Sequence, residues 1–344
     1  MHAMECKPRR LVEGRRSLRH SYVCFGCMQS RYSILVFIVC MLYTHIVDEI
    51  ILNRLRDALL TRTSLDHLPD DVWKRSSALN TWGTNAIEGN TLTWKEVERL
   101  LLEDLSVANK PIRDVLETLQ HESTFRGLLL RKDQPITMQT VLELHESVFK
   151  GVKADAGRWR RVNVRITGSP HTPPRMEKVV PEMESLLREY DSRDMKGVEV
   201  FGLGAWFHHG FESVHPFSDG NGRVGRLLLN LHFLKHNWPF VHILPPDRET
   251  YLDAMGKGHS SDLSDLALFL KELMGRSILD LLDQVGTADD ELRPLKNLVS
   301  KGPYSAHYLS LRAGHGRLPA IKVAGDWRTS VRALRLYREF TGRD

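Results

Sequence analysis

Apolar residues recur at spacings of three and four positions along most of the chain, from about Ile46 to Asp290. This spacing is that of one face of an α-helix, so the pattern predicts a succession of amphipathic helices. The clearest stretches are 97–105, 112–130, 138–148, 179–190 and 263–282. Thr93, followed three positions later by Glu96, is typical of a capping box that opens a helix. The pattern therefore predicts an all-α body.

One internal segment departs from this pattern, from Gly157 to Pro174. Val162, Val164 and Ile166 alternate with polar residues, and a turn-forming Gly-Ser-Pro sequence follows them. Alternating β-branched residues before a turn signal predict a short β-hairpin inserted in the helical body.

The composition changes past Thr287 to a Gly- and Arg-rich tail, which places a domain boundary near 290. Within residues 291–344 we expect a short helix, a two-stranded turn around Gly325 and a last helix over 331–340. These elements predict a small winged helix-turn-helix. The expected organisation is an N-terminal extension (1–45), a helical region (46–135), a core (136–285) and the C-terminal module (291–344).

Bulk composition indicates an ordinary globular protein, with 42% hydrophobic and 26% charged residues. The net charge of +5 is unevenly distributed, because residues 291–344 carry eleven Lys or Arg against four acids. A basic end segment is where a nucleic-acid contact would lie. A solvated basic helix explains the same charge, and both interpretations stay open.

All four cysteines fall within the first forty residues, and Cys24 and Cys27 form a CxxC without a second pair. The main fold thus has no disulfide, which favours a reducing, cytoplasmic location. The apolar run from Ile34 to Tyr43 follows basic residues, as in a signal peptide, but no small-residue cleavage site follows it. It is short for a bilayer span, so no firm membrane association is predicted. A half-buried helix and an extension outside the working protein remain alternatives.

The segment 215–226, His-Pro-Phe-Ser-Asp-Gly-Asn-Gly-Arg-Val-Gly-Arg, concentrates the chemistry of the chain. Its proline and glycines indicate a loop, and the apolar residues from 223 to 236 indicate a buried helix after it. Gly220 and Gly222 allow backbone N–H groups at the helix start to approach a phosphate closely. Arg223 and Arg226 are three apart and share a helix face, where they can bind phosphate oxygens.

Two further residues of the segment complete a reactive set. Asp219 provides a hard oxygen suited to Mg²⁺ that bridges phosphates. His215 titrates near neutrality and can accept a proton from an attacking hydroxyl. Base, metal ligand, anion cradle and two cations thus lie within twelve residues.

The segment resembles the Fic family motif HPFx[D/E]GNGRxxR at every specified position. The resemblance covers about Ile50 to Leu282. It implies an all-helical Fic bundle that transfers AMP from the co-substrate ATP to a Tyr, Thr or Ser hydroxyl of a target protein. The residue roles implied are His215 as base, Asp219 as Mg²⁺ ligand, Asn221 with the amides of Gly220 and Gly222 as anion cradle, Arg223 as phosphate ligand and Arg226 as γ-phosphate ligand.

The resemblance also assigns roles outside the motif. The hairpin around Ile166, Thr167, Gly168 and Ser169 looks like the family's flap, which aligns the target backbone by strand addition. A purely structural hairpin is the alternative. Tyr251 resembles a position that lines the adenine pocket.

Thr84 and Glu88 lie four apart, so on a helix they project from one face. They resemble the family's inhibitory motif [S/T]xxxE[G/N], on a helix over about 80–90, which implies that Glu88 pairs with Arg226 and displaces the γ-phosphate. A solvent-facing Glu88 at a helix end capped by Gly89 is the alternative. The same carboxylate can also orient a water molecule for removal of AMP.

The C-terminal module resembles excisionase-like winged helix-turn-helix modules through Leu318-Pro319-Ala320 and Trp327-Arg328. Two interpretations stay open: DNA binding, or a surface for dimerisation or target docking. The family resemblance is compatible with a homodimer. Transfer of another nucleotide is a further alternative, while the intact Gly220, Asn221 and Arg226 favour AMP over phosphate transfer.

Overall fold

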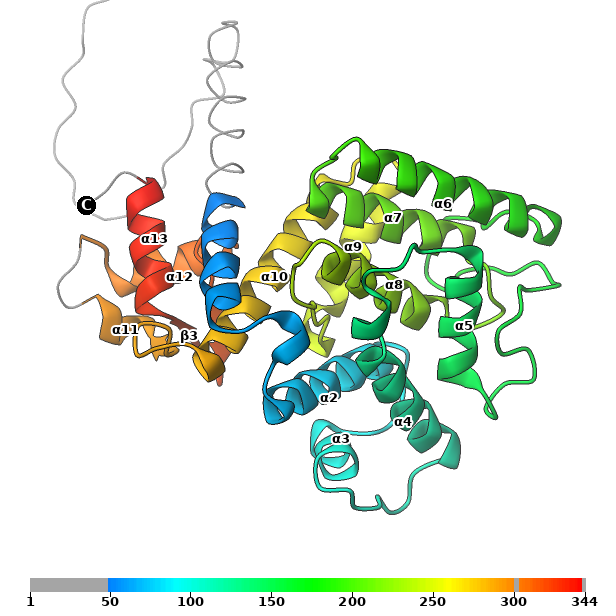
Figure 1. Cartoon of the computed structure of the whole chain (residues 1–344), viewed down its shortest axis with the longest axis horizontal. Coiled ribbons are helices and arrows are strands. Elements are labelled where there is room, and N and C mark those ends of the chain that lie inside the picture. The colour runs from blue at the N-terminus through cyan, green and yellow to red at the C-terminus, as the bar shows by residue number, and fades with distance from the viewer. Residues whose placement is uncertain (1–48, 300–302, 342–344) are drawn as a thin grey trace, which may run out of the picture. The chain divides into compact units, whose positions relative to one another are not determined.

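The computed structural model describes residues 49–299 and 303–341. The N-terminal extension, with its CxxC and its apolar run, lies outside them. A helical segment at 49–62 comes first (Figure 1). The following helices are α2 (Asp70–Ile87), α3 (Trp94–Leu101), α4 (Ile112–Arg126), α5 (Met138–Phe149), α6 (Val179–Met195), α7 (Val200–Val214), α8 (Asn221–Lys235), α9 (Arg248–Gly258), α10 (Ser264–Val285), α11 (Leu295–Leu298), α12 (Ala306–Gly314) and α13 (Val331–Thr341).

This architecture confirms the prediction of a mainly helical body. The expected helix at 138–148 matches α5 closely, and the expected helix at 263–282 matches α10. The Thr93 capping box opens α3, where the Thr93 N–H donates to Glu96 at 2.8 Å. Within the described residues, no helix combines the length and apolar character needed to cross a membrane.

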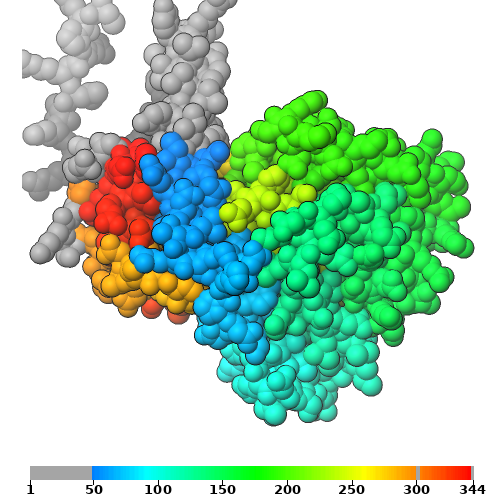
Figure 2. Space-filling view, in the orientation of Figure 1, coloured from blue at the N-terminus to red at the C-terminus, as the bar shows by residue number. Residues whose placement is uncertain are grey.

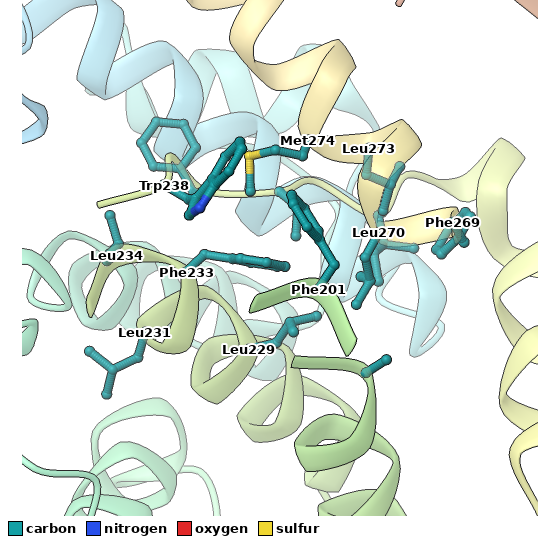
Figure 3. Packing of buried hydrophobic residues seen from close by; sticks show 14 of the residues in the cluster. Phe201, Leu229, Leu231, Phe233, Leu234, Trp238, Phe269, Leu270, Leu273 and Met274 are labelled. Atoms are coloured by element: carbon teal, nitrogen blue, oxygen red, sulfur yellow. The ribbon is translucent and has the colours of Figure 1, made fainter. Parts of the chain in front are cut away.

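The core surrounds α8, which is buried along nearly its whole length. Figure 3 shows Leu229 and Phe233 of α8 facing Phe201 of α7, with Leu270 and Met274 of α10 nearby. The Phe201 and Phe233 ring centroids are 5.5 Å apart. α8 is enclosed by other helices and also buries polar side chains, among them Asn221, Arg223 and Arg226 in its first turns, so the start of α8 is rigidly held.

The N-terminal helices reach the same central helix. α2 packs against α3, α4 and α8. A small separate cluster of Ala78, Leu92 and Val97 fixes α3 against α2. In the space-filling view the surface of α4 continues into that of α5 (Figure 2). Because α2 packs on both α4 and α8, its end lies against the first turns of α8.

The expected hairpin between Gly157 and Pro174 differs from what the structure shows. These residues, all described, contain no strand. A turn is present, with the Ser169 N–H donating to the Ile166 carbonyl at 3.2 Å and Gly168 at a φ of 80°. Val162 is 56% exposed, so the alternating residues bury too little apolar surface to hold two strands together. We call residues 157–174 the flap from here on.

The only strands in the described part of the chain lie in the C-terminal segment. β1 (Arg293–Pro294), β3 (Asp326–Thr329) and β2 (Ile321–Val323) form an antiparallel sheet in that order. Ala324 and Gly325, both with positive φ, form the tight turn between β2 and β3. The turn around Gly325 and the helix after it agree with the sequence pattern, while the domain boundary near 290 stays a prediction.

Candidate active site

The candidate site begins where α7 ends. His215 follows the last residue of α7 and adopts the left-handed conformation, with φ 50° and ψ 60°. Its N–H donates to the Phe211 carbonyl at 3.0 Å. This conformation stops the helix and turns the chain sharply into the loop. The His215 side chain is 19% exposed and therefore stays accessible to a substrate.

The tautomer of His215 follows from its hydrogen bond. Nδ1 lies 3.3 Å from the Glu212 carbonyl, which can only accept. Nδ1 therefore carries the proton, and Nε2 of the neutral ring has its lone pair available. Burial lowers the pKa of His215, which favours the neutral ring that a general base requires.

Asn221 closes the loop between His215 and α8. Its Oδ1 accepts from the Phe217 N–H at 2.9 Å, and its Nδ2 donates to the Phe217 carbonyl at 3.0 Å. The Phe217 ring stacks on that of His145 at 3.8 Å. The side chain expected at the anion cradle thus fixes the shape of the loop.

Gly220 and Gly222 have distinct reasons for being glycine. Gly220 has a φ of 86°, and a Cβ there would lie 2.2 Å from the Phe149 ring. A Cβ on Gly222 would lie 2.3 Å from Glu88 Oε1. Neither position has room for a side chain, and without one the backbone N–H groups at the start of α8 can approach a phosphate more closely.

Arg226 lies in the buried first turns of α8 and is held by the end of α2. Its Nε donates to Thr84 Oγ1 at 2.6 Å, and its Nη2 donates to Glu88 Oε1 at 2.7 Å. Burial opposes ionisation of Glu88, but the charge and the hydrogen bond of Arg226, together with the charge of Arg223, outweigh it and lower the pKa of Glu88. Glu88 caps the end of α2 and Gly89 follows with positive φ; the carboxylate binds Arg226, and the Glu88 side chain stays one-third exposed.

Arg223 has a separate partner. Its Nη1 lies 2.5 Å from Glu117 Oε2 of α4, and its guanidinium lies over the Phe149 ring at 4.4 Å. Arg113 also donates to Glu117, at 2.8 Å. Arg223 and Glu117 are both buried. No sequence pattern indicates Glu117 as a partner, because 106 positions separate it from Arg223.

Asp219 is the expected metal ligand. Burial opposes its ionisation, but a hydrogen bond from Lys153 and its charge lower the pKa of Asp219, so the carboxylate is ionised. Among the described residues, no group of three His, Cys, Asp or Glu is arranged to hold a metal ion. An ionised carboxylate with phosphate and water oxygens is a common Mg²⁺ environment, so the residues present fit this ion.

A second titratable group near the base was missed by the sequence reasoning. Glu212 Oε2 lies 3.9 Å from His215 Nδ1, and Glu212 Oε1 is buried without a hydrogen-bond partner in the described structure. Burial raises the pKa of Glu212 to about 8. Its place in α7, three residues before the base, is the signal that was available.

Arg160 attaches the flap to the catalytic loop. Its Nε donates to the His215 carbonyl at 2.8 Å, and its Nη2 donates to the Pro174 carbonyl at 2.5 Å. The backbone N–H of Arg160 also donates to the Pro216 carbonyl at 2.9 Å. The turn of Ile166, Thr167, Gly168 and Ser169 lies beyond this anchor, and its two central residues are exposed.

Tyr251 of α9 lies in the core. It is 4% exposed, and its hydroxyl donates to Nε2 of His208 at 2.8 Å, since His208 Nδ1 is bound to the Gly225 carbonyl. Its expected place in an adenine pocket stays a prediction.

The residues that form this geometry are similar in sequence to known proteins. Residues 135–233 match the Fic/DOC family. The chain is 29% identical over 199 residues to a protein adenylyltransferase Fic of Nematostella vectensis, covering 57% of this chain and 46% of that protein. It is 27% identical over 279 residues to protein adenylyltransferase fic-1 of Caenorhabditis elegans, covering 75% of this chain and 54% of that protein. The chain thus spans about half the length of these relatives.

Solved structures show the same fold. Fic-1 of Caenorhabditis elegans superposes with a TM-score of 0.61 at 25% identity, covering 73% of this chain and 74% of that one. A Fic domain containing signaling protein from Bacteroides thetaiotaomicron also gives 0.61, at 23% identity, covering 67% of this chain and 97% of that one. The motif loop, the helical bundle around α8 and these matches agree: residues 135–233 match the Fic/DOC family, and the described structure has the fold of solved Fic proteins.

Proposed function

We propose that this chain transfers the AMP group of ATP to a hydroxyl of a target protein. The observation that carries the proposal is the position of His215. Its neutral ring, with Nε2 available, stands at the entrance of a loop that leads directly into the bare, positively polarised start of α8. The names of the relatives support the same reaction.

In this reaction the target hydroxyl oxygen attacks the α-phosphorus as its proton passes to His215 Nε2. The new P–O bond forms while the bond from the α-phosphorus to the bridging oxygen breaks, and pyrophosphate leaves. The amides of Gly220 and Gly222 and the guanidiniums of Arg223 and Arg226 would stabilise the charge on the phosphates. Mg²⁺, held by Asp219, would neutralise part of that charge.

We further propose that the ground state is inhibited. Arg226 cannot bind a γ-phosphate while it is bound to Thr84 and Glu88. ATP then binds in a pose from which the α-phosphorus is poorly aligned. Removing the Glu88 carboxylate frees Arg226, which should increase the rate of transfer.

The test is incorporation of label from α-labelled ATP with Mg²⁺. We compare the unmodified protein, Glu88→Gly, and Glu88→Gly combined with His215→Ala. Label on protein only with Glu88→Gly supports the reaction, the base and the inhibition together. Equal incorporation by the first two refutes the inhibition, and incorporation without His215 refutes its role as base. Release of label from AMP-modified protein would instead indicate AMP removal, and label only from another nucleotide would indicate a different co-substrate.

The flap is proposed as the docking site of the target. It has no strand partner within itself, so its backbone N–H and C=O groups can pair with an added strand. Arg160 fixes it to the His215 carbonyl, which would place an acceptor side chain close to the base.

A second candidate function is DNA binding by residues 291–344. The order α11, α12, β2, β3, α13 and the exposed Lys322 in β2 favour it. Arg332 and Arg335 bind Asp290 and Asp289, however, so part of the basic surplus is neutralised locally. A shift of duplex DNA at low salt, lost on deleting 291–344, tests this function. Absence of a shift favours dimerisation or target docking, and sedimentation would show a homodimer.

We also propose a cytoplasmic location, because no cysteine follows Cys40 in the sequence. Imaging of a tagged full-length chain tests it.

A further inference from the structure

The Asp219 carboxylate is contacted by cations from outside the motif. Lys153 Nζ lies 2.5 Å from Asp219 Oδ2, and Arg113 Nη2 lies 3.5 Å from the same oxygen. Lys153 belongs to the connection between α5 and the flap, whereas Arg113 is in the first turn of α4. The side chain expected to bind a metal is thus already neutralised by an ammonium group.

The chain holds Lys153 in this place. The Lys153 N–H donates to the Phe149 carbonyl at 2.9 Å, and two residues later the Asp155 carboxylate accepts from the Ser218 hydroxyl. The Gly157 N–H donates to His145 Nδ1 at 2.9 Å. The other ring nitrogen, Nε2, therefore carries the proton and donates to the Asp219 carbonyl at 3.1 Å. The connection from 150 to 157 is docked on the motif loop, and the Lys153 side chain is only 17% exposed.

An ammonium group and a divalent cation compete for the same oxygen. Mg²⁺ binds carboxylate oxygens at about 2.0–2.1 Å and brings two positive charges, so it would strongly repel an ammonium at the same carboxylate. The other oxygen, Oδ1, lies 3.9 Å from Arg223 Nη2, so both oxygens of Asp219 already face a cation, and we expect Lys153 to move when a metal binds. Free metal supplies no new anion for the displaced ammonium, whereas a nucleoside triphosphate supplies several phosphate oxygens.

We propose that the Lys153 ammonium occupies the cation position on Asp219 in the nucleotide-free protein, so that a divalent cation binds there only together with a nucleoside triphosphate. When the two arrive together, the metal takes the carboxylate, and Lys153 moves to the phosphates. Lys153 thereby couples metal binding to nucleotide binding. This inference rests on the proposed role of Asp219 as metal ligand, but not on the transfer reaction itself.

The test is direct binding of Mn²⁺, measured by the loss of the free-ion paramagnetic resonance signal, without nucleotide or target protein. The variants are Lys153→Met, the charge-conserving Lys153→Arg, and Lys150→Met as a matched control. Lys150 is an exposed lysine at the start of the same connection, and its side chain has no ion pair with Asp219 in the described structure. Thermal unfolding shows that each variant is folded.

Removing the ammonium should strengthen Mn²⁺ binding at least about tenfold in Lys153→Met, because a unit positive charge beside the carboxylate is lost. Lys153→Arg and Lys150→Met should bind Mn²⁺ as weakly as the unmodified protein. Adding Asp219→Asn to Lys153→Met should abolish the gain. In a second titration, the non-transferable analogue α,β-methylene-ATP should strengthen Mn²⁺ binding more in the unmodified protein than in Lys153→Met, because only the unmodified protein has an ammonium for the phosphates to draw away. A titration of the analogue without protein corrects for the Mn²⁺ that the analogue itself binds.

Equal Mn²⁺ affinity in the unmodified protein and Lys153→Met overturns the proposal, as does tight binding by the unmodified protein without nucleotide. A gain that survives Asp219→Asn also overturns it, since the ion would then bind elsewhere. Failure of AMP transfer would leave these results unaffected, because no transfer occurs in the titration.

Discussion

Replacing Thr84 by valine should release the proposed inhibition only in part. The substitution keeps the shape of the side chain and removes the hydroxyl that accepts from Arg226 Nε at 2.6 Å. Arg226 keeps two other acceptors, the Thr84 carbonyl at 3.3 Å and Glu88 Oε1 at 2.7 Å. The inhibited arrangement therefore loses one of three contacts.

The size of the effect follows from the type of bond that is lost. A hydrogen bond to a charged group contributes about 1.5–3 kcal/mol, and Arg226 is 5% exposed, so water cannot easily replace the hydroxyl. Part of this loss is recovered if the guanidinium shifts toward Glu88. We expect the inhibited state to weaken by about 1–2 kcal/mol, which corresponds to a roughly 5- to 30-fold faster transfer.

The assay is initial-rate incorporation of label from α-labelled ATP, with Thr84→Ser as control. The order of rates should be unmodified protein and Thr84→Ser lowest, Thr84→Val intermediate and Glu88→Gly highest. Thr84→Val should also unfold at a lower temperature, because it leaves the buried Nε without its acceptor. A Thr84→Val rate equal to that of the unmodified protein, while Glu88→Gly is active, would show that the hydroxyl takes no part in holding Arg226.

Three further substitutions test the rest of the site. Glu212→Gln should stabilise the protein above about pH 5. Burial raises the pKa of Glu212 from 4.5 to about 8, so between these values the folded state retains a proton that the unfolded state has lost, and the stability of the unmodified protein falls as pH rises. Equal pH dependence of the urea midpoints of the two proteins would contradict this. Gly220→Ala should lose most nucleotide binding in calorimetry, because its Cβ would lie 2.2 Å from the Phe149 ring; unchanged affinity would show that the loop can move. Glu117→Gln should lower the free energy of unfolding by about 3–5 kcal/mol, because Arg223 stays buried without its carboxylate; a change below about 1 kcal/mol in denaturant unfolding would contradict this.

The sequence predicted those parts of the site that are close together along the chain. His215, Asp219 and Arg226 fall in one loop and helix start, where composition and spacing are enough to indicate a base, a metal ligand and a phosphate cation. Contacts across long separations gave no such signal. Lys153 and Glu117 reach the site only through the packing of α4 and α5 against the motif loop, which no local pattern encodes.

In the flap, by contrast, the local sequence pattern predicted a β-hairpin, but the tertiary structure contains no strand there. Val162 and its alternating neighbours have the composition of a strand, yet no second strand or sheet packs against them within the described residues. Arg160 instead fixes the segment through backbone carbonyls. Strand propensity depends on a partner surface, and here a bound target would supply it.

The two motif arginines show how one helix start can be stable and still allow the inhibition that we propose. Each binds a carboxylate from a distant helix, but the surroundings differ. Arg223 and Glu117 are 4% and 5% exposed in their side chains, so separating them would leave two buried charges unpaired. The Glu88 side chain is 33% exposed, whereas the side chain of its partner Arg226 is 6% exposed, so water can receive the carboxylate when it leaves. Opening the Glu88 pair is therefore much less costly than opening the Glu117 pair. Under the proposed inhibition, Glu88 could therefore leave Arg226 without unfolding the site while Arg223 stays fixed, and we expect loss of Glu117 to reduce stability and loss of Glu88 to raise activity.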